Sequence, residues 1–117
     1  MTPRSMTVEN LFALPADRPA AEGSINLLAR GNRLRIERIV SRGQATAKGR
    51  WYDQEQAEWV LLLQGKASLE WDDGSATALT AGDWLLIPAH KRHRVTSTTA
   101  EPPCIRLAVH GEMLAAD

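Results

Sequence analysis

The sequence has few of the features that mark secreted or membrane-spanning proteins. It has a single cysteine, Cys104, so no disulfide can form within the chain, which suits a reducing compartment. The longest apolar run, residues 59–63, is far shorter than the roughly 20 residues that cross a bilayer, and the chain does not begin with a charged segment followed by an apolar stretch. We therefore expect a cytoplasmic protein with no membrane partner.

Neither sign of charge is in excess, because 14 basic side chains face 14 acidic ones. A balanced chain creates no long-range field that would concentrate nucleic acid or anionic lipid at its surface. Hydrophobic residues make up 44% of the 117 residues, which is enough for the packed core of one domain. A small neutral or mixed-charge molecule is the expected ligand, and no nucleic acid is expected.

The chain also lacks any stretch with the length and period of an ordinary helix. From Ile25 onward, short strand-like runs are separated by turn signals, among them Gly31-Asn32 and Asp72-Asp73-Gly74, which predict two hairpins. The expected strands are residues 26–30, 33–40, 59–63, 66–71, 76–79, 84–87, a segment from 93, and 104–110. The continuous run 59–63 predicts a central strand that is buried on both sides. This pattern predicts an all-β barrel or sandwich.

The ends of the chain differ in composition from this strand-rich part. Residues 1–23 contain three prolines and are interpreted as an irregular N-terminal arm, residues 24–112 as one barrel domain, and residues 113–117 as a C-terminal tail. A few apolar side chains of the arm predict a turn that docks on the barrel: Val8, Leu11, Phe12 and Leu14. The predicted strand 33–40 has one mostly apolar face, with Leu34 and Ile36 on it.

Two stretches of the sequence contain residues at the spacing of a known pair of sequence motifs. In the later stretch, Gly82, Pro88 and His93 are in register with a motif in which His90 replaces a second glycine and Ser97 an asparagine. In the earlier stretch, Glu58 and Gly65 match the end of the partner motif. Over residues 25–110 the chain therefore resembles the cupin superfamily. This resemblance implies a single-domain β-barrel of the jelly-roll-like, double-stranded β-helix type.

The beginning of the earlier motif, a pair of histidines in cupins, is replaced here. Counting back from Glu58, the two positions hold either Trp51 and Asp53 or Tyr52 and Gln54. The segment 51–54 is similar to a variant among small bacterial cupins. Side chains two apart on a strand point to the same face, so only one pair can face the barrel interior. The sequence leaves open which pair does.

In cupins, the two histidines, the glutamate and the later histidine usually hold one divalent metal. Carried over to this chain, the resemblance implies a candidate metal site made of Asp53, Gln54, Glu58 and His93. Such an oxygen-rich set with one nitrogen suits Mn, Fe(II) or Zn. Independently of the family, a buried Glu58 carboxylate would need a metal, an arginine or a proton as partner. A histidine at position 93 that only makes structural hydrogen bonds is the alternative interpretation.

Three hypotheses about function follow. The first is a small cupin that binds a divalent metal in its barrel pocket, and the sequence leaves open whether it is an enzyme on a small organic substrate; no catalytic residue is assigned. The second is a metal-free cupin that binds or senses a small molecule without catalysis. In the third, Glu58 and His93 pair only with each other, and the protein is an accessory partner. We expect a homodimer, since open sheet edges favour pairing.

Overall fold

A computed structural model describes residues 6–14 and 23–116, and within these ranges the chain forms strands and no helix. The eight strands are β1 (Ser24–Gly31), β2 (Leu34–Ser41), β3 (Ala57–Gln64), β4 (Lys66–Trp71), β5 (Ala76–Thr80), β6 (Trp84–Ile87), β7 (His93–Thr98) and β8 (Cys104–Gly111). The described residues include no helix long and apolar enough to cross a membrane. The predicted all-β fold is confirmed.

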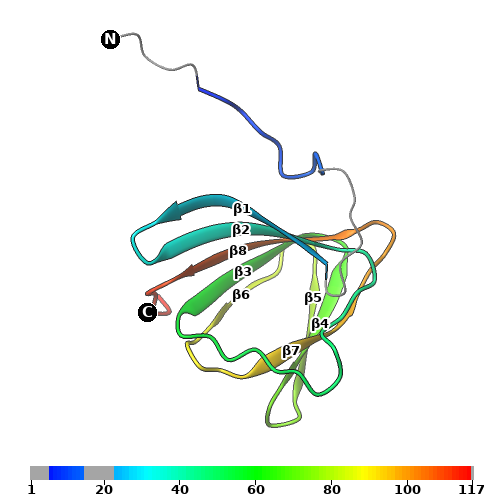
Figure 1. Ribbon diagram of the computed structural model, residues 1–117. Coiled ribbons are helices and arrows are strands. Elements are labelled where there is room, and N and C mark those ends of the chain that lie inside the picture. The colour runs from blue at the N-terminus through cyan, green and yellow to red at the C-terminus, as the bar shows by residue number, and fades with distance from the viewer. Residues whose placement is uncertain (1–5, 15–22, 117) are drawn as a thin grey trace.

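The strands form two antiparallel sheets (Figure 1). The larger sheet has the order β1-β2-β8-β3-β6, and the smaller one has the order β5-β4-β7. The last strand, β8, returns to the middle of the larger sheet and pairs with β2 and β3. Residues from the two ends of the barrel sequence therefore become neighbours on one wall.

The turn between β1 and β2 lies one residue later than predicted. Gly31 pairs with Leu34, so the two connecting residues are Asn32 and Arg33, not Gly31 and Asn32. The left-handed residue of this turn is Arg33, with a φ of 59°. Because Arg33 adopts the left-handed conformation, Gly31 keeps its pairing with Leu34 in the β1–β2 ladder.

A compact apolar cluster fills one part of the space between the sheets. It is formed by Val60, Leu62, Ala67, Leu69, Leu79, Ile87 and Cys104. On β3 the buried residues Glu58, Val60 and Leu62 alternate with residues that are only half-buried, such as Trp59 and Leu61. The expectation of a strand buried on both sides is therefore met on the inner face and only partly on the outer one.

The long connection between β2 and β3 closes the side of the smaller sheet next to β7. Its backbone bonds to β7 at two places, from Thr46 N to Val95 O (2.8 Å) and between Tyr52 and His93 in both directions (2.8 and 3.1 Å). Farther along, His90 N donates to Gln54 O (2.7 Å). These bonds fix the segment that carries residues 51–54 against the strand that begins with His93.

The described part of the N-terminal arm contacts the barrel through polar atoms. The Arg38 guanidinium donates to the carbonyl oxygens of Leu11 (3.1 Å) and Ala13 (3.3 Å). Val8 is 93% exposed and Phe12 is also exposed, whereas Leu11 and Leu14 are half-buried, so two of the four side chains predicted to dock do not. The backbone carbonyls of a short irregular turn have no ladder partners, and a long arginine side chain can satisfy several of them at once.

Candidate functional site

A cavity of about 590 Å³ lies between the two sheets, beside the apolar cluster. This volume is in the range that holds small organic ligands. Both sheets and the β2–β3 connection contribute to its wall. The polar residues of the wall are Arg35, Glu37, Ser41, Gln44, Thr46, Arg50, Tyr52, Gln54, Glu58, His93, Arg106 and His110.

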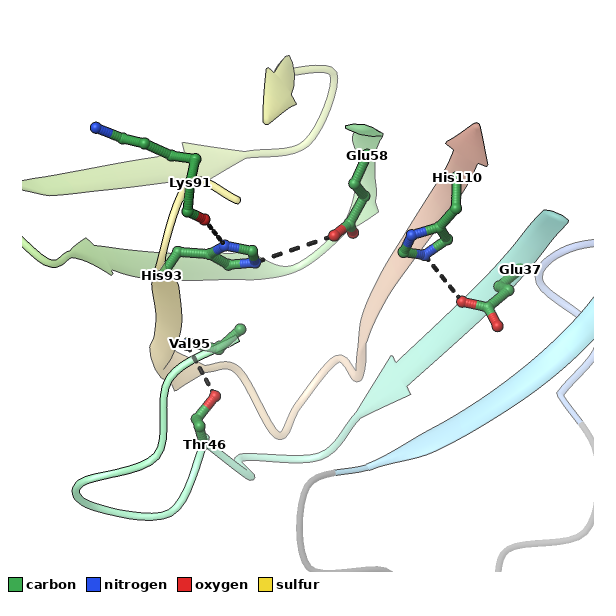
Figure 2. A network of polar contacts seen from close by, with 7 residues as sticks. All are labelled: Glu37, Thr46, Glu58, Lys91, His93, Val95 and His110. Carbon is green, nitrogen blue, oxygen red and sulfur yellow. Dashed lines mark hydrogen bonds and ion pairs between the residues drawn. The ribbon is translucent and has the colours of Figure 1, made fainter. Parts of the chain in front are cut away.

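His93 and Glu58 face each other across this cavity (Figure 2). His93 Nδ1 lies 2.9 Å from the carbonyl oxygen of Lys91, and since a carbonyl only accepts, Nδ1 carries the proton of this bond. His93 Nε2 lies 4.0 Å from Glu58 Oε1, too far for a hydrogen bond. Both residues are buried, at 4% and 7% exposed. In the neutral imidazole, a nitrogen lone pair and a carboxylate thus point into the same buried gap.

Of the two alternative pairs in segment 51–54, Tyr52 and Gln54 line the cavity. The backbone pairing of Tyr52 with His93 sets this orientation, and the two rings lie 5.6 Å apart between centroids. Gln54 Oε1 is buried and has no hydrogen-bond partner within residues 6–14 and 23–116. A residue of the cavity wall therefore carries a third acceptor atom that lacks a donor in the described part of the chain.

The other pair, Trp51 and Asp53, does not line the cavity. Asp53 Oδ1 lies 2.7 Å from His90 Nδ1, with both side chains largely exposed. The guanidinium groups of Arg92 and Arg94 lie over the Trp51 ring, at 5.8 and 5.9 Å from its centroid. The structure thus brings three of the four candidate ligands, Gln54, Glu58 and His93, to one cavity, and it places Asp53 outside.

The contact between Asp53 and His90 also accounts for a departure from the motif. His90 takes the place of the second motif glycine and has a φ of 62°, the left-handed conformation that glycine adopts most easily. Its side chain contacts Asp53 and its backbone N–H donates to Gln54 O. These two contacts hold a non-glycine residue in this conformation.

A second histidine–glutamate pair on the cavity wall was not predicted from the sequence. His110 Nε2 lies 3.1 Å from Glu37 Oε1, and Arg35 Nε donates to Glu37 Oε2 at 2.9 Å (Figure 2 shows His110 and Glu37). In the ladders, His110 lies between Glu58 of β3 and Arg35 of β2. The available signal was the alternation of residues 34–39. The face with Arg35, Glu37 and Ile39 lines the cavity, whereas the mostly apolar face with Leu34 and Ile36 does not.

Arg106, on the same face of β8, was also missed. It is 8% exposed, and its Nη2 donates to the hydroxyl of the fully buried Ser41 (3.1 Å). Its Nε has no hydrogen-bond partner in the described part of the chain. The cavity wall therefore holds a buried cation as well as the group of acceptors.

The acceptor group can be tested for its fit to a divalent metal. The part of the chain that the structure describes has no group of three or more His, Cys, Asp or Glu side chains that could hold a metal. The third donor is instead the orphaned amide oxygen of Gln54, beside Glu58 and His93. The hydrogen bond from His93 Nδ1 to a carbonyl is the usual arrangement that orients a metal-binding imidazole. These three residues fit a hard or borderline divalent cation.

The comparison with solved structures found a relative that is 40% identical. It is a protein of Ralstonia eutropha JMP134, provisionally named a mannose-6-phosphate isomerase; the match covers 92% of this chain and 100% of that one, with a TM-score of 0.81. A Klebsiella pneumoniae protein with a double-stranded β-helix domain matches at 18% identity, over 96% of this chain and 95% of that one, with a TM-score of 0.71.

A cupin superfamily protein of Desulfitobacterium hafniense DCB-2 matches at 22% identity, over 90% of this chain and 100% of that one, with a TM-score of 0.63. No curated protein sequence matches significantly. The family described as "Cupin domain" matches residues 39–110, which include β3 to β7, most of β8 and the end of β2. With a family match over more than half of its length and a 40% identical relative of the same fold, this chain belongs to the cupin superfamily.

Proposed function

We propose that this protein binds a divalent metal in its cavity through His93, Glu58 and Gln54, together with a small organic molecule. The observation that carries the proposal is a group of three acceptors on the cavity wall that have no donor among the described residues: the Nε2 of His93, the carboxylate of Glu58 and the amide oxygen of Gln54. Buried acceptors that face one another are costly unless a cation, a proton or a donor group lies between them.

The chain's own residues orient the candidate ligands without the help of a metal. The carbonyl of Lys91 holds the His93 ring with Nε2 toward the cavity, so no imidazole rotation is needed on binding. The backbone pairing of Tyr52 with His93 brings Gln54 to the same wall. A divalent ion bound there would supply positive charge that polarises an oxygen of a ligand. The rest of the 590 Å³ leaves room for that ligand.

The proposal is tested by metal analysis of the purified, tag-free protein after separate exposure to Mn, Fe(II) and Zn. We expect close to one metal per chain for the wild type and a loss of that metal in His93→Ala. The matched control is Asp53→Ala, since Asp53 lies outside the cavity, and this variant should retain the metal. Absence of metal in the wild type, or equal loss in both variants, would overturn the proposal.

A metal-free binding protein is the second candidate, and one observation favours it. Tyr52 and Gln54 occupy the positions that hold histidines in other cupins, and the described residues lack a cluster of three His, Cys, Asp or Glu side chains. The same acceptors would then bind hydroxyl or ammonium donors of a ligand. Thermal-shift measurements on chelator-treated protein discriminate the two: a metal-free binder keeps its ligand response, whereas a metal-dependent one regains it only with added metal. Mannose 6-phosphate belongs in this screen because of the name of the R. eutropha relative.

A further inference from the structure

Among the described residues, Arg106 is a buried cation of the cavity wall without an anionic partner. It is 8% exposed, and its guanidinium donates a hydrogen bond to the neutral hydroxyl of Ser41. No carboxylate of residues 6–14 and 23–116 lies within ion-pair distance of it, and its Nε lacks any acceptor there. Arginine remains protonated in proteins, so the group cannot escape this situation by losing its proton.

The register of the sheet explains why the neighbouring strands do not compensate this charge. Arg106 pairs with Ile39 of β2 on one side and with Leu62 of β3 on the other, both apolar. The nearest acidic residue on this face of β2 is Glu37, and its two oxygens already contact His110 and Arg35. The local wall therefore offers Arg106 a hydroxyl and hydrocarbon only.

The carboxylates of the cavity wall are placed with other groups. Glu37 contacts His110 and Arg35, and Glu58 lies near His93. Neither carboxylate forms an ion pair with Arg106 in the described part of the chain. An uncompensated buried charge destabilises a protein, so its presence in a cavity indicates a site where a ligand supplies the counter-charge.

We infer that Arg106 and Ser41 form a subsite for the carboxylate or phosphate group of a small organic anion. The inference deepens the proposed function, since it takes the cavity to be a small-molecule site, but it does not require the metal. Along β8, Arg106 is four residues from His110, which pairs with Glu58, so the two backbone positions are about 13 Å apart. The anionic group would bind at one end of the cavity and the rest of the molecule would extend toward Glu58 and His93.

The experiment compares ligands that differ in their anionic group: glucose, gluconate and glucose 6-phosphate, with inorganic phosphate as the simplest probe. Binding is measured by calorimetry on both metal-loaded and chelator-treated protein. We expect at least one anion to bind about tenfold or more tightly than glucose, and Arg106→Gln to remove that preference. A carboxylate preference and a phosphate preference are distinguished by which compound binds. The matched control is Arg30→Gln, which removes the charge of an arginine outside the cavity wall and should leave the preference intact.

The melting temperature of the ligand-free protein tests the inference even if none of these probes fits the cavity. If Arg106 is retained for ligand binding, its replacement by the similarly long but uncharged side chain in Arg106→Met raises the melting temperature of the ligand-free protein. A lower melting temperature together with an unchanged anion preference would overturn the inference. Two further outcomes distinguish this subsite from the metal site. Arg106→Met should lose anion binding and keep the metal. His93→Ala should lose the metal and keep anion binding.

Discussion

The two histidines of the cavity wall differ in the nitrogen that their partners fix. The carbonyl of Lys91 requires a proton on Nδ1 of His93, whereas the carboxylate of Glu37 requires one on Nε2 of His110. In their neutral forms, His93 therefore presents Nε2 as an acceptor to the cavity, while Nε2 of His110 is committed as a donor. Of these two histidines, His93 is therefore the one whose Nε2 is left to accept a cation.

Cys104 gives a pH-dependent prediction at the same scale. Burial raises the pKa of its thiol above the ordinary value of 9.0, although the positive charge of Arg106 opposes this effect. A raised pKa means that the folded protein holds the proton more tightly than the unfolded chain. The contribution to stability is then complete below about pH 9 and is lost as the pH rises through the raised pKa.

We therefore expect the free energy of unfolding to decrease above about pH 9, and the decrease to be smaller in Cys104→Ala. Denaturant melts of both proteins between neutral pH and pH 10 measure this difference. The native thiol should also react with a disulfide reagent far more slowly than the thiol of the unfolded chain. Identical pH profiles for the two proteins would contradict the assignment.

Individual site residues were predictable only where a motif fixed their spacing. Glu58 and His93 were identified in this way, and both line the cavity. The choice between Tyr52 with Gln54 and Trp51 with Asp53 depends on which residue pairs with His93 across the sheet, and that long-range pairing has no local sequence signal. Arg106 was missed because one buried arginine in an otherwise apolar strand resembles a surface position.

At the scale of single elements, the strand boundaries were largely predictable and the faces of β2 were not. Short alternating runs and turn residues locate strands because their signals are local. The usual rule that apolar side chains point inward would turn the face with Leu34 and Ile36 toward the interior. In β2 the rule fails, since the interior next to Arg35 and Glu37 is a binding cavity and not a packed core.

The tight turn between β3 and β4 gives a prediction about Gly65. Its φ is 85°, and an added Cβ would lie 2.3 Å from Thr99 Oγ1 and 3.0 Å from Cys104 Cα. We expect Gly65→Ala to lower the free energy of unfolding by more than the roughly 1–2 kcal/mol that the left-handed conformation alone costs an alanine. Chemical denaturation measures the loss.

Gly74 is the matched control, since its φ is 89° but an added Cβ would meet nothing within 4 Å. Gly74→Ala should therefore show the conformational cost alone. If the two variants lose equal stability, the close contacts at Gly65 relax without cost and the explanation is wrong.

At the scale of the whole molecule, the edge of the larger sheet that β1 forms is a candidate site for association. Strand β1 is at this edge, and its side chains Ile25, Leu27 and Leu28 are 63%, 51% and 44% exposed. An exposed apolar edge strand favours association. We propose that a second copy of the chain covers it.

Light scattering after size-exclusion chromatography tests this proposal. We expect the mass of a dimer for the wild type and a shift toward the monomer for Leu28→Lys, because a charge at the edge opposes strand association. A substitution of an exposed residue outside the strands, Lys48→Glu, should leave the mass unchanged. A monomeric wild type would contradict the proposal.

The cavity wall carries the acceptors of Gln54, Glu58 and His93 and the buried cation Arg106. The most direct test of the central claim is anomalous diffraction from crystals of the protein loaded with Mn or Zn. The account predicts one anomalous peak in the cavity, bonded to His93 Nε2, Glu58 and the amide oxygen of Gln54. An empty cavity, or a peak only at the exposed pair of Asp53 and His90, would contradict it.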